Sequence, residues 1–226
     1  PGQAGVNVQR IGSWVPPCCL PGLKRWMAMD LPLTLLMAPQ AYRLNPSRPL
    51  GRESAGAGFL EAYIRYSGNH RHHVVVADPS HGEWFHAEAC RHDTTAETVV
   101  GSLHEWGDTA AATGAIALPG PGLDDWAWKR MPWGDGSFSL VGLVHTLCSR
   151  SVQWGLGQFS VAPVRPWDAL VCTSTAARQV VEGFLERQET WLKQRLGAQC
   201  FEQPQLPVIP LGVHPEVWAC LLYTSP

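Results

Sequence analysis

Residues 167–214 constrain the fold of this chain more than any other stretch. They begin with a short apolar run at 169–172, continue with an amphipathic segment of helix length, and end with a second apolar run at 206–213. A strand, a helix and a strand in this order form a crossover between two parallel strands of one sheet. The block therefore predicts an α/β fold with a parallel sheet.

The helix inside this block is predicted residue by residue. Thr173 or Ser174 is placed to cap it, because a hydroxyl there accepts a backbone N–H that has no partner within the helix. Gly197 is a natural residue to end it. Between them, apolar residues recur every three or four positions and form one face, namely Ala177, Val180, Val181, Phe184, Leu185, Trp191, Leu192 and Leu196.

Four further apolar runs of strand length precede this block, at residues 33–38, 73–77, 115–118 and 138–144. Helices are expected at 57–66 and 94–106, and a long Pro-rich loop at 39–54. Strands that alternate with helical segments predict a Rossmann-like parallel sheet with helices on both faces. We expect this domain to span residues 29–213, with a leader at 1–28 and a tail at 214–226 that do not belong to it.

Composition narrows the function classes. The net charge of -2 does not favour binding to nucleic acid. No apolar run approaches the roughly 18 residues of a membrane-spanning helix. The seven cysteines contain no Cys-x-x-Cys pair, which indicates reduced thiols in the cytoplasm rather than a disulfide framework. Eleven tryptophans are many for this length, and we interpret them mainly as core and loop residues.

Three segments follow predicted strands and are therefore candidates for a ligand site. In an open α/β sheet, ligands bind outside the carboxyl ends of the strands. The segments are 51–58, His145 with Thr146, and 173–175, and each can direct helix N-terminal N–H groups at an anion such as a diphosphate. Ser174 and its neighbours have the simpler interpretation of helix caps, whereas the end of a strand would direct His145 into the crevice.

Two alternative sites have weaker patterns. Gly56 and Gly58, with Asp78 at the end of the next strand, partly match a dinucleotide fingerprint. The loop before them is too long for its tight turn, and Glu61 stands where Gly or Ala is required. Residues 81–92 hold His81, His86, Cys90 and His92 but lack the spacing of a zinc site, so we interpret them as solvated loop histidines and predict no metal.

Several segments together resemble one enzyme family. DALVCTSTAARQVVE at 168–182 and LPVIPLGVH at 206–214 look like the end of the N-terminal domain of family 4 glycosyltransferases, the retaining enzymes of GT-B fold. The segments YRLNPSRPLGRESAGAGFL, PGPGLDDWAWKR, FSLVGLVHTLCS and APVRPWDAL are similar to bacterial members. The resemblance covers about residues 31–213.

This resemblance implies transfer of a sugar from a nucleotide-activated donor to a glycan or lipid-linked acceptor, with retention of configuration and without a metal or other cofactor. It implies that the loop with Gly51, Arg52, Ser54 and Gly56 approaches the donor diphosphate. It also implies that His145 is catalytic, close to the donor sugar. Thr146 and Ser174, which follow predicted strands, are further candidates for binding the substrate or the donor phosphate. Peripheral contact with a membrane is a further expectation.

Two departures from the family concern the end of the chain. His214 stands where the family has Asp, and CLLYTSP resembles translated adapter sequence. We therefore expect the chain to hold the acceptor side alone, without the C-terminal donor domain, and to be inactive by itself. Two alternatives stay open, namely a Rossmann-like nucleotide-binding module that acts through a partner, and a nicotinamide-dependent oxidoreductase.

Overall fold

The computed structural model describes residues 32–43 and 51–212, with the side chain of Arg52 outside the description. The expected leader at 1–28 and tail at 214–226 lie outside the described residues. In the described part, a six-stranded sheet has the order β3-β2-β1-β4-β5-β6, and every pairing is parallel. This confirms the predicted α/β, Rossmann-like fold. The strands are β1 (Thr34–Met37), β2 (Arg71–Val76), β3 (Glu97–Ser102), β4 (Ala115–Ala117), β5 (Ser139–Leu143) and β6 (Ala169–Val171).

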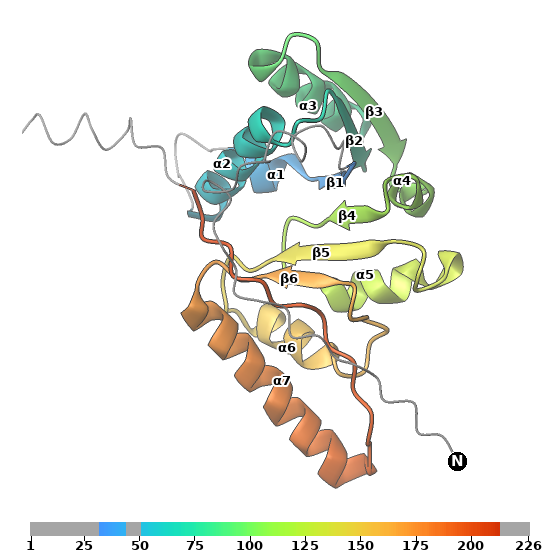
Figure 1. Cartoon of the computed structure of the whole chain (residues 1–226), viewed down its shortest axis with the longest axis vertical. Coiled ribbons are helices and arrows are strands. Elements are labelled where there is room, and N and C mark those ends of the chain that lie inside the picture. Colours follow the sequence, from blue (N-terminus) through green and yellow to red (C-terminus); the bar gives the residue numbers. More distant parts are fainter. Residues whose placement is uncertain (1–31, 44–50, 213–226) are drawn as a thin grey trace, which may run out of the picture.

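Helices cover both faces of the sheet (Figure 1). Neighbouring residues of one strand belong to different core clusters, because successive side chains point to opposite faces. Val74 packs in a cluster with α1 (Pro39–Tyr42), α2 (Gly51–Tyr66) and α3 (Pro79–His92). Val75 packs in the other cluster, with α4 (Trp106–Thr113), α5 (Leu123–Arg130), α6 (Arg150–Gln158) and α7 (Thr175–Leu196). A short 3-10 helix, η3 (Met131–Trp133), follows α5.

Helix α7 agrees with its sequence-based prediction. The Ser174 hydroxyl accepts the backbone N–H of Ala177 at 3.1 Å and caps the helix. Gly197 follows the last residue with φ of 68°, in the left-handed region where glycine has no steric penalty. Of the predicted apolar face, Val181, Leu185 and Leu192 are buried, whereas Val180, Trp191 and Leu196 are exposed. Cap, periodicity and stop signal all pointed to the same helix.

The helix expected at 94–106 is wrong. Residues Glu97–Ser102 form β3 at the edge of the sheet, and α4 starts only at Trp106. Thr98, Val99 and Val100 are three successive β-branched residues, which favour an extended backbone. As an edge strand, β3 leaves Val99 and Val100 partly exposed. Because β3 has no buried residue, its sequence lacks the apolar run that identified the buried strands.

Two segments expected as loops are helical. Asp78 caps α3 by accepting the N–H of Ser80 at 2.8 Å, and Pro79 occupies the first turn, so residues 81–92 are not a loop. Helix α2 starts at Gly51 rather than at 57. Gly56 is buried there against α1, where any Cβ would overlap the carbonyl oxygen of Ala41. Gly56, which suggested a loop, thus serves helix packing.

The strand expected at 206–213 is not a regular strand over its described part. The segment runs beside β6 and makes only two isolated bridges, Ala169 to Gln205 and Cys172 to Val208. The N–H of Cys172 bonds to the Pro207 carbonyl at 2.9 Å, but Pro207 has no N–H to return to Leu170. The proline therefore interrupts the ladder. Figure 1 shows this segment following β6 to the edge of the sheet where α2 lies.

Candidate functional site

A cavity of about 280 Å³ lies across the carboxyl ends of the central strands. Strand order reverses between β1 and β4, and such a switch point is where open α/β sheets bind ligands. The cavity is lined from α1, α2, the β4 end, β5, β6 and the segment beside β6. These residues are Ala41, Tyr42, Ala55, Gly56, Gly58, Phe59, Ala62, Ala117, Leu118, Pro119, Val141, Gly142, Leu143, His145, Val171, Ile209, Pro210, Leu211 and Gly212.

His145 supplies the imidazole of this cavity. Its position is set by pairing on both sides of β5. The N–H of Val144 donates to Val171 at 2.9 Å, and the N–H of Leu143 donates to Gly120 at 3.2 Å. Buried Val144 anchors the adjacent residue in the core. His145 is thereby held at the cavity wall, as the strand-end argument predicted.

The hydrogen bonds of His145 determine its neutral tautomer. Nε2 lies 2.6 Å from the carbonyl oxygen of Pro119. A carbonyl only accepts, so Nε2 carries the proton and Nδ1 of the neutral ring is an acceptor. Nδ1 is buried and has no hydrogen-bond partner among the described residues. A buried acceptor without a partner is costly, and a ligand that donates a hydrogen bond would satisfy it.

The other predicted site residues divide between the cavity and its surroundings. Gly56 lines the cavity, whereas Gly51, Ser54, Thr146 and Ser174 are not among its lining residues. Gly51 and Ser54 lie exposed in the first turn of α2, and the helical backbone of Arg52 lies between them. The exposed Thr146 hydroxyl accepts the N–H of Cys148 at 3.3 Å. Ser174 has the capping role already described.

Sequence reasoning missed most of the lining. Tyr42, Phe59 and Pro119 lie in segments that resemble the family, and Ala62 follows one of them. None of them has a reactive side chain that would have marked it as a site residue, because their role is to shape the cavity or to orient His145. Helical spacing is the one signal that was available. Ala55, Gly58, Phe59 and Ala62 follow i, i+3, i+4, i+7 and form one face of α2.

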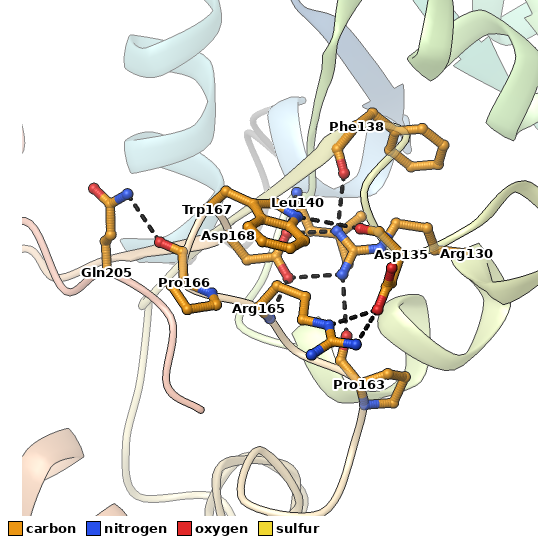
Figure 2. Close-up of polar contacts among 10 residues, drawn as sticks. All are labelled: Arg130, Asp135, Phe138, Leu140, Pro163, Arg165, Pro166, Trp167, Asp168 and Gln205. Carbon is orange, nitrogen blue, oxygen red and sulfur yellow. Dashed lines mark hydrogen bonds and ion pairs between the residues drawn. The ribbon is translucent and has the colours of Figure 1, made fainter. Parts of the chain in front are cut away.

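The most strongly bonded polar cluster lies elsewhere. Arg130 and Asp168 are both fully buried and form a two-pronged ion pair, with N–O distances of 2.6 and 2.9 Å (Figure 2). Arg130 also donates to the carbonyls of Phe138 and Pro163 at 2.9 and 3.1 Å. Asp168 accepts the N–H of Leu140 at 2.8 Å. Because these groups meet at the amino ends of β5 and β6, opposite the cavity, we interpret the pair as structural.

The histidine-rich segment does not gather into a metal site. Within residues 32–43 and 51–212, no group of three or more His, Cys, Asp or Glu side chains is placed to hold a metal ion. His86 and Cys90 lie one turn apart on α3, with Nε2 3.6 Å from Sγ. His86 Nδ1 lies 3.1 Å from the Thr98 hydroxyl of β3. His92 pairs with Glu88 at 3.8 Å.

The partial dinucleotide fingerprint does not have the geometry that it requires. Its glycines should form the tight turn between the first strand and the helix. Instead, Gly56 and Gly58 lie inside α2, and α1 intervenes after β1. Asp78 is engaged by Ser80, whose hydroxyl donates to its carboxylate at 2.6 Å. The hydrogen bonds from Ser80 lower the pKa of Asp78.

Comparison with known proteins identifies no relative from which a function could be inferred. No protein-family model, curated protein or solved structure matches this chain. Among the described residues, no helix is both long and apolar enough to cross a bilayer. The functional argument therefore depends on the position of the cavity, its lining and the free acceptor of His145.

Proposed function

We propose that this chain is the acceptor-side domain of a retaining glycosyltransferase that uses a nucleotide-activated sugar. The observation that carries the proposal is His145, which stands at the carboxyl end of β5 with a buried Nδ1 that has no partner in the described part of the chain. This is the position where the resemblance expects the histidine of the catalytic centre. The switch-point location of the cavity and the strand order 3-2-1-4-5-6 agree with it.

The chemistry of transfer fits this arrangement. The acceptor oxygen forms a bond to the anomeric carbon while the bond from that carbon to the diphosphate oxygen breaks, and the hydroxyl proton leaves with the nucleoside diphosphate. Nδ1 of His145 can accept a hydrogen bond from a substrate hydroxyl at this centre and orient it. The cavity lining contains no Lys, Arg, Asp or Glu among the described residues. Binding of the diphosphate is therefore assigned to groups outside the cavity lining, among which the resemblance points to the first turn of α2 with Gly51, Arg52 and Ser54.

The test compares this chain with a longer reading frame that contains it. We expect the 226-residue chain alone to show little or no transfer, because the proposal gives this domain only the acceptor side of the reaction. We expect the longer protein to transfer sugar with retention, and His145→Ala to lower its rate about 100-fold, the size typical of losing one positioned polar group. His104→Ala, an exposed histidine outside the cavity, is the matched control.

Rapid transfer by the short chain would refute the assignment to the acceptor side. An unchanged rate in the His145→Ala enzyme would refute the role of His145. Paired glutamates downstream in the longer frame would support the family, and transfer should survive chelation of divalent metals.

A non-catalytic nucleotide-binding module is the second candidate. The strand order favours it, because the same order serves dinucleotide-binding domains. The position of Gly56 and Gly58 inside α2 speaks against nicotinamide. Titration with NADH, followed by its fluorescence, tests this candidate, and saturable binding by the folded chain would support it over transfer.

A further inference from the structure

The cavity beside His145 is almost entirely apolar. Among the described residues that line it, Tyr42 and His145 alone have polar side-chain atoms, and none has a carboxylate, amide, hydroxymethyl or cationic side chain. Tyr42 is itself buried, and burial raises its pKa, so its phenol stays neutral. The chemistry that the cavity offers a ligand is therefore an apolar surface with very few hydrogen-bonding groups.

Opposing elements form this apolar surface. On one side, Ala55, Gly58, Phe59 and Ala62 line it from a single face of α2. Phe59 is 37% exposed, so part of its ring is open to contact. On the other side are the ends of β4, β5 and β6 and the apolar residues 209–211. At about 280 Å³ the cavity lies at the small end of ligand pockets, so it suits one ring or a short chain.

A sugar ring is a poor match for such a cavity. Each of its hydroxyls gives up hydrogen bonds to water on entry and needs a partner inside. A hydroxyl that finds none weakens binding about tenfold. An apolar group of the same size gains affinity from every part of its surface that leaves water. The lining thus discriminates between these two chemical classes of ligand.

One hydroxyl is nevertheless accommodated. Nε2 of His145 is committed to the Pro119 carbonyl at 2.6 Å, which leaves Nδ1 as a buried acceptor with no partner in the described residues. A ligand that carries one hydroxyl at this point would donate to Nδ1 and leave the rest of its surface to the apolar walls.

We propose that this cavity binds an apolar alcohol, a hydroxyl carried on an aryl or alkyl group, as the acceptor of the transfer reaction. The identification of the ligand as the acceptor rests on the proposed function. The binding chemistry itself follows from the cavity lining and from the tautomer of His145. An acceptor of this class is recognised through one hydrogen bond and its apolar surface, unlike the non-reducing end of a polysaccharide.

The experiment measures binding to the 226-residue chain without any sugar donor. The probes are 2-naphthol, 1-octanol and methyl glucoside. The affinity of each is measured by titration calorimetry, and its contact with His145 is detected by NMR of the imidazole ring. We expect 2-naphthol or 1-octanol to bind at least tenfold more tightly than methyl glucoside and to shift the His145 signals. The preferred one of the two identifies an aryl or an alkyl acceptor. Binding of methyl glucoside as tight as that of both alcohols would overturn the proposal.

A second comparison isolates the hydrogen bond. The probe 2-methylnaphthalene has the shape of 2-naphthol but no donor. We expect the ratio of the two affinities to change about fivefold or more between the wild-type chain and His145→Phe, and to stay constant in the control His104→Phe. An unchanged ratio in folded His145→Phe would overturn the role of Nδ1.

The same data separate failure of this inference from failure of the proposed function. Alcohol binding without sugar transfer by the longer protein would remove the glycosyltransferase assignment and leave an apolar-alcohol site. Transfer to a free sugar but not to 2-naphthol or 1-octanol would keep the assignment and remove the apolar acceptor.

Discussion

At the scale of single residues, the buried pair Arg130 and Asp168 explains why an aspartate stands at the first position of the segment 168–182. Asp168 heads the segment that resembles the glycosyltransferase family, yet it lies at the amino end of β6, where its carboxylate bonds to Arg130 and to the backbone of Leu140 and Arg165. Its position ties the start of β6 to β5 and α5. The aspartate of this segment therefore has a structural role, not a catalytic one.

We predict that Arg130→Met destabilises the chain by about 3–5 kcal/mol, because it leaves a buried carboxylate without its cation. Lys129→Met is the control, since Lys129 forms an exposed pair with Asp125 at 2.6 Å, and such pairs contribute less than about 1 kcal/mol. Urea unfolding curves measure both. Equal effects of the two substitutions would contradict the structural role of the pair.

His72 is a second residue whose environment has an observable consequence. It is fully buried on β2 between Tyr63 and Phe85, with ring centroids 5.5 and 5.9 Å away. Neither ring nitrogen has a hydrogen-bond partner in the described residues. Burial lowers the pKa of His72, the charges of His70 and His73 lower it further, and Asp93 opposes them.

A lowered pKa predicts a loss of stability in acid. Below about pH 6.5 the unfolded chain binds a proton that the folded site refuses, so the free energy of unfolding falls as the pH falls from there toward the folded pKa. We expect His72→Phe to flatten this dependence, as measured by urea midpoints from pH 5 to 8. Superimposable pH profiles for the two proteins would show that another group is responsible.

At the scale of elements, a hydroxyl at the start of a helix can either cap the helix or bind a ligand, and a substitution can distinguish the two roles. Ser174 was a candidate for binding the donor diphosphate, yet its hydroxyl caps α7 and the residue does not line the cavity. The two roles respond differently to charge. A cap needs an oxygen acceptor, and a diphosphate site cannot tolerate a carboxylate.

We therefore predict that Ser174→Ala lowers stability by about 1 kcal/mol, whereas Ser174→Asp keeps it, because aspartate caps helices as well as serine does. Thermal unfolding of the chain measures the capping role. In the longer protein that the proposed function requires, Ser174→Asp should leave the Michaelis constant for the sugar nucleotide unchanged. A large rise in that constant would restore Ser174 to the donor site.

Secondary structure was predictable where local signals agree, as in α7 and in β1, β2, β4, β5 and β6. It was not predictable where tertiary contacts decide. Strand β3 is extended because it pairs with β2 along six residues, and the 205–212 segment lies beside β6 although Pro207 prevents a full ladder. In α2, packing of Gly56 against α1 outweighs the usual preference of glycine for loops.

At the scale of the whole molecule, one sheet joins two cores. Leu35 belongs to the cluster under α1 to α3, and Leu140 to the cluster under α4 to α7. Both are fully buried. Because adjacent residues of the same strands supply both clusters, loss of either face should disturb the other.

We predict that Leu35→Ala and Leu140→Ala each cost about 2–5 kcal/mol and that each variant still unfolds in one transition. In a Trp84→Phe background, which removes the tryptophan packed against the first core, the cluster of Trp106, Trp126 and Trp133 reports on the second core. Tryptophan fluorescence and far-UV circular dichroism should therefore give coincident curves. Separate transitions in Leu35→Ala would mean that the two faces fold independently.

Periodicity, caps and the spacing of apolar runs were enough to determine the α/β class, the parallel sheet and the position of His145 at the end of a strand. These are local properties, so they can be read along the chain. The order of the strands, the apolar lining of the cavity and the tautomer of His145 were decided only by tertiary structure. Each depends on residues far apart in sequence, such as the 26-position separation between Pro119 and His145, that meet only when the sheet is assembled.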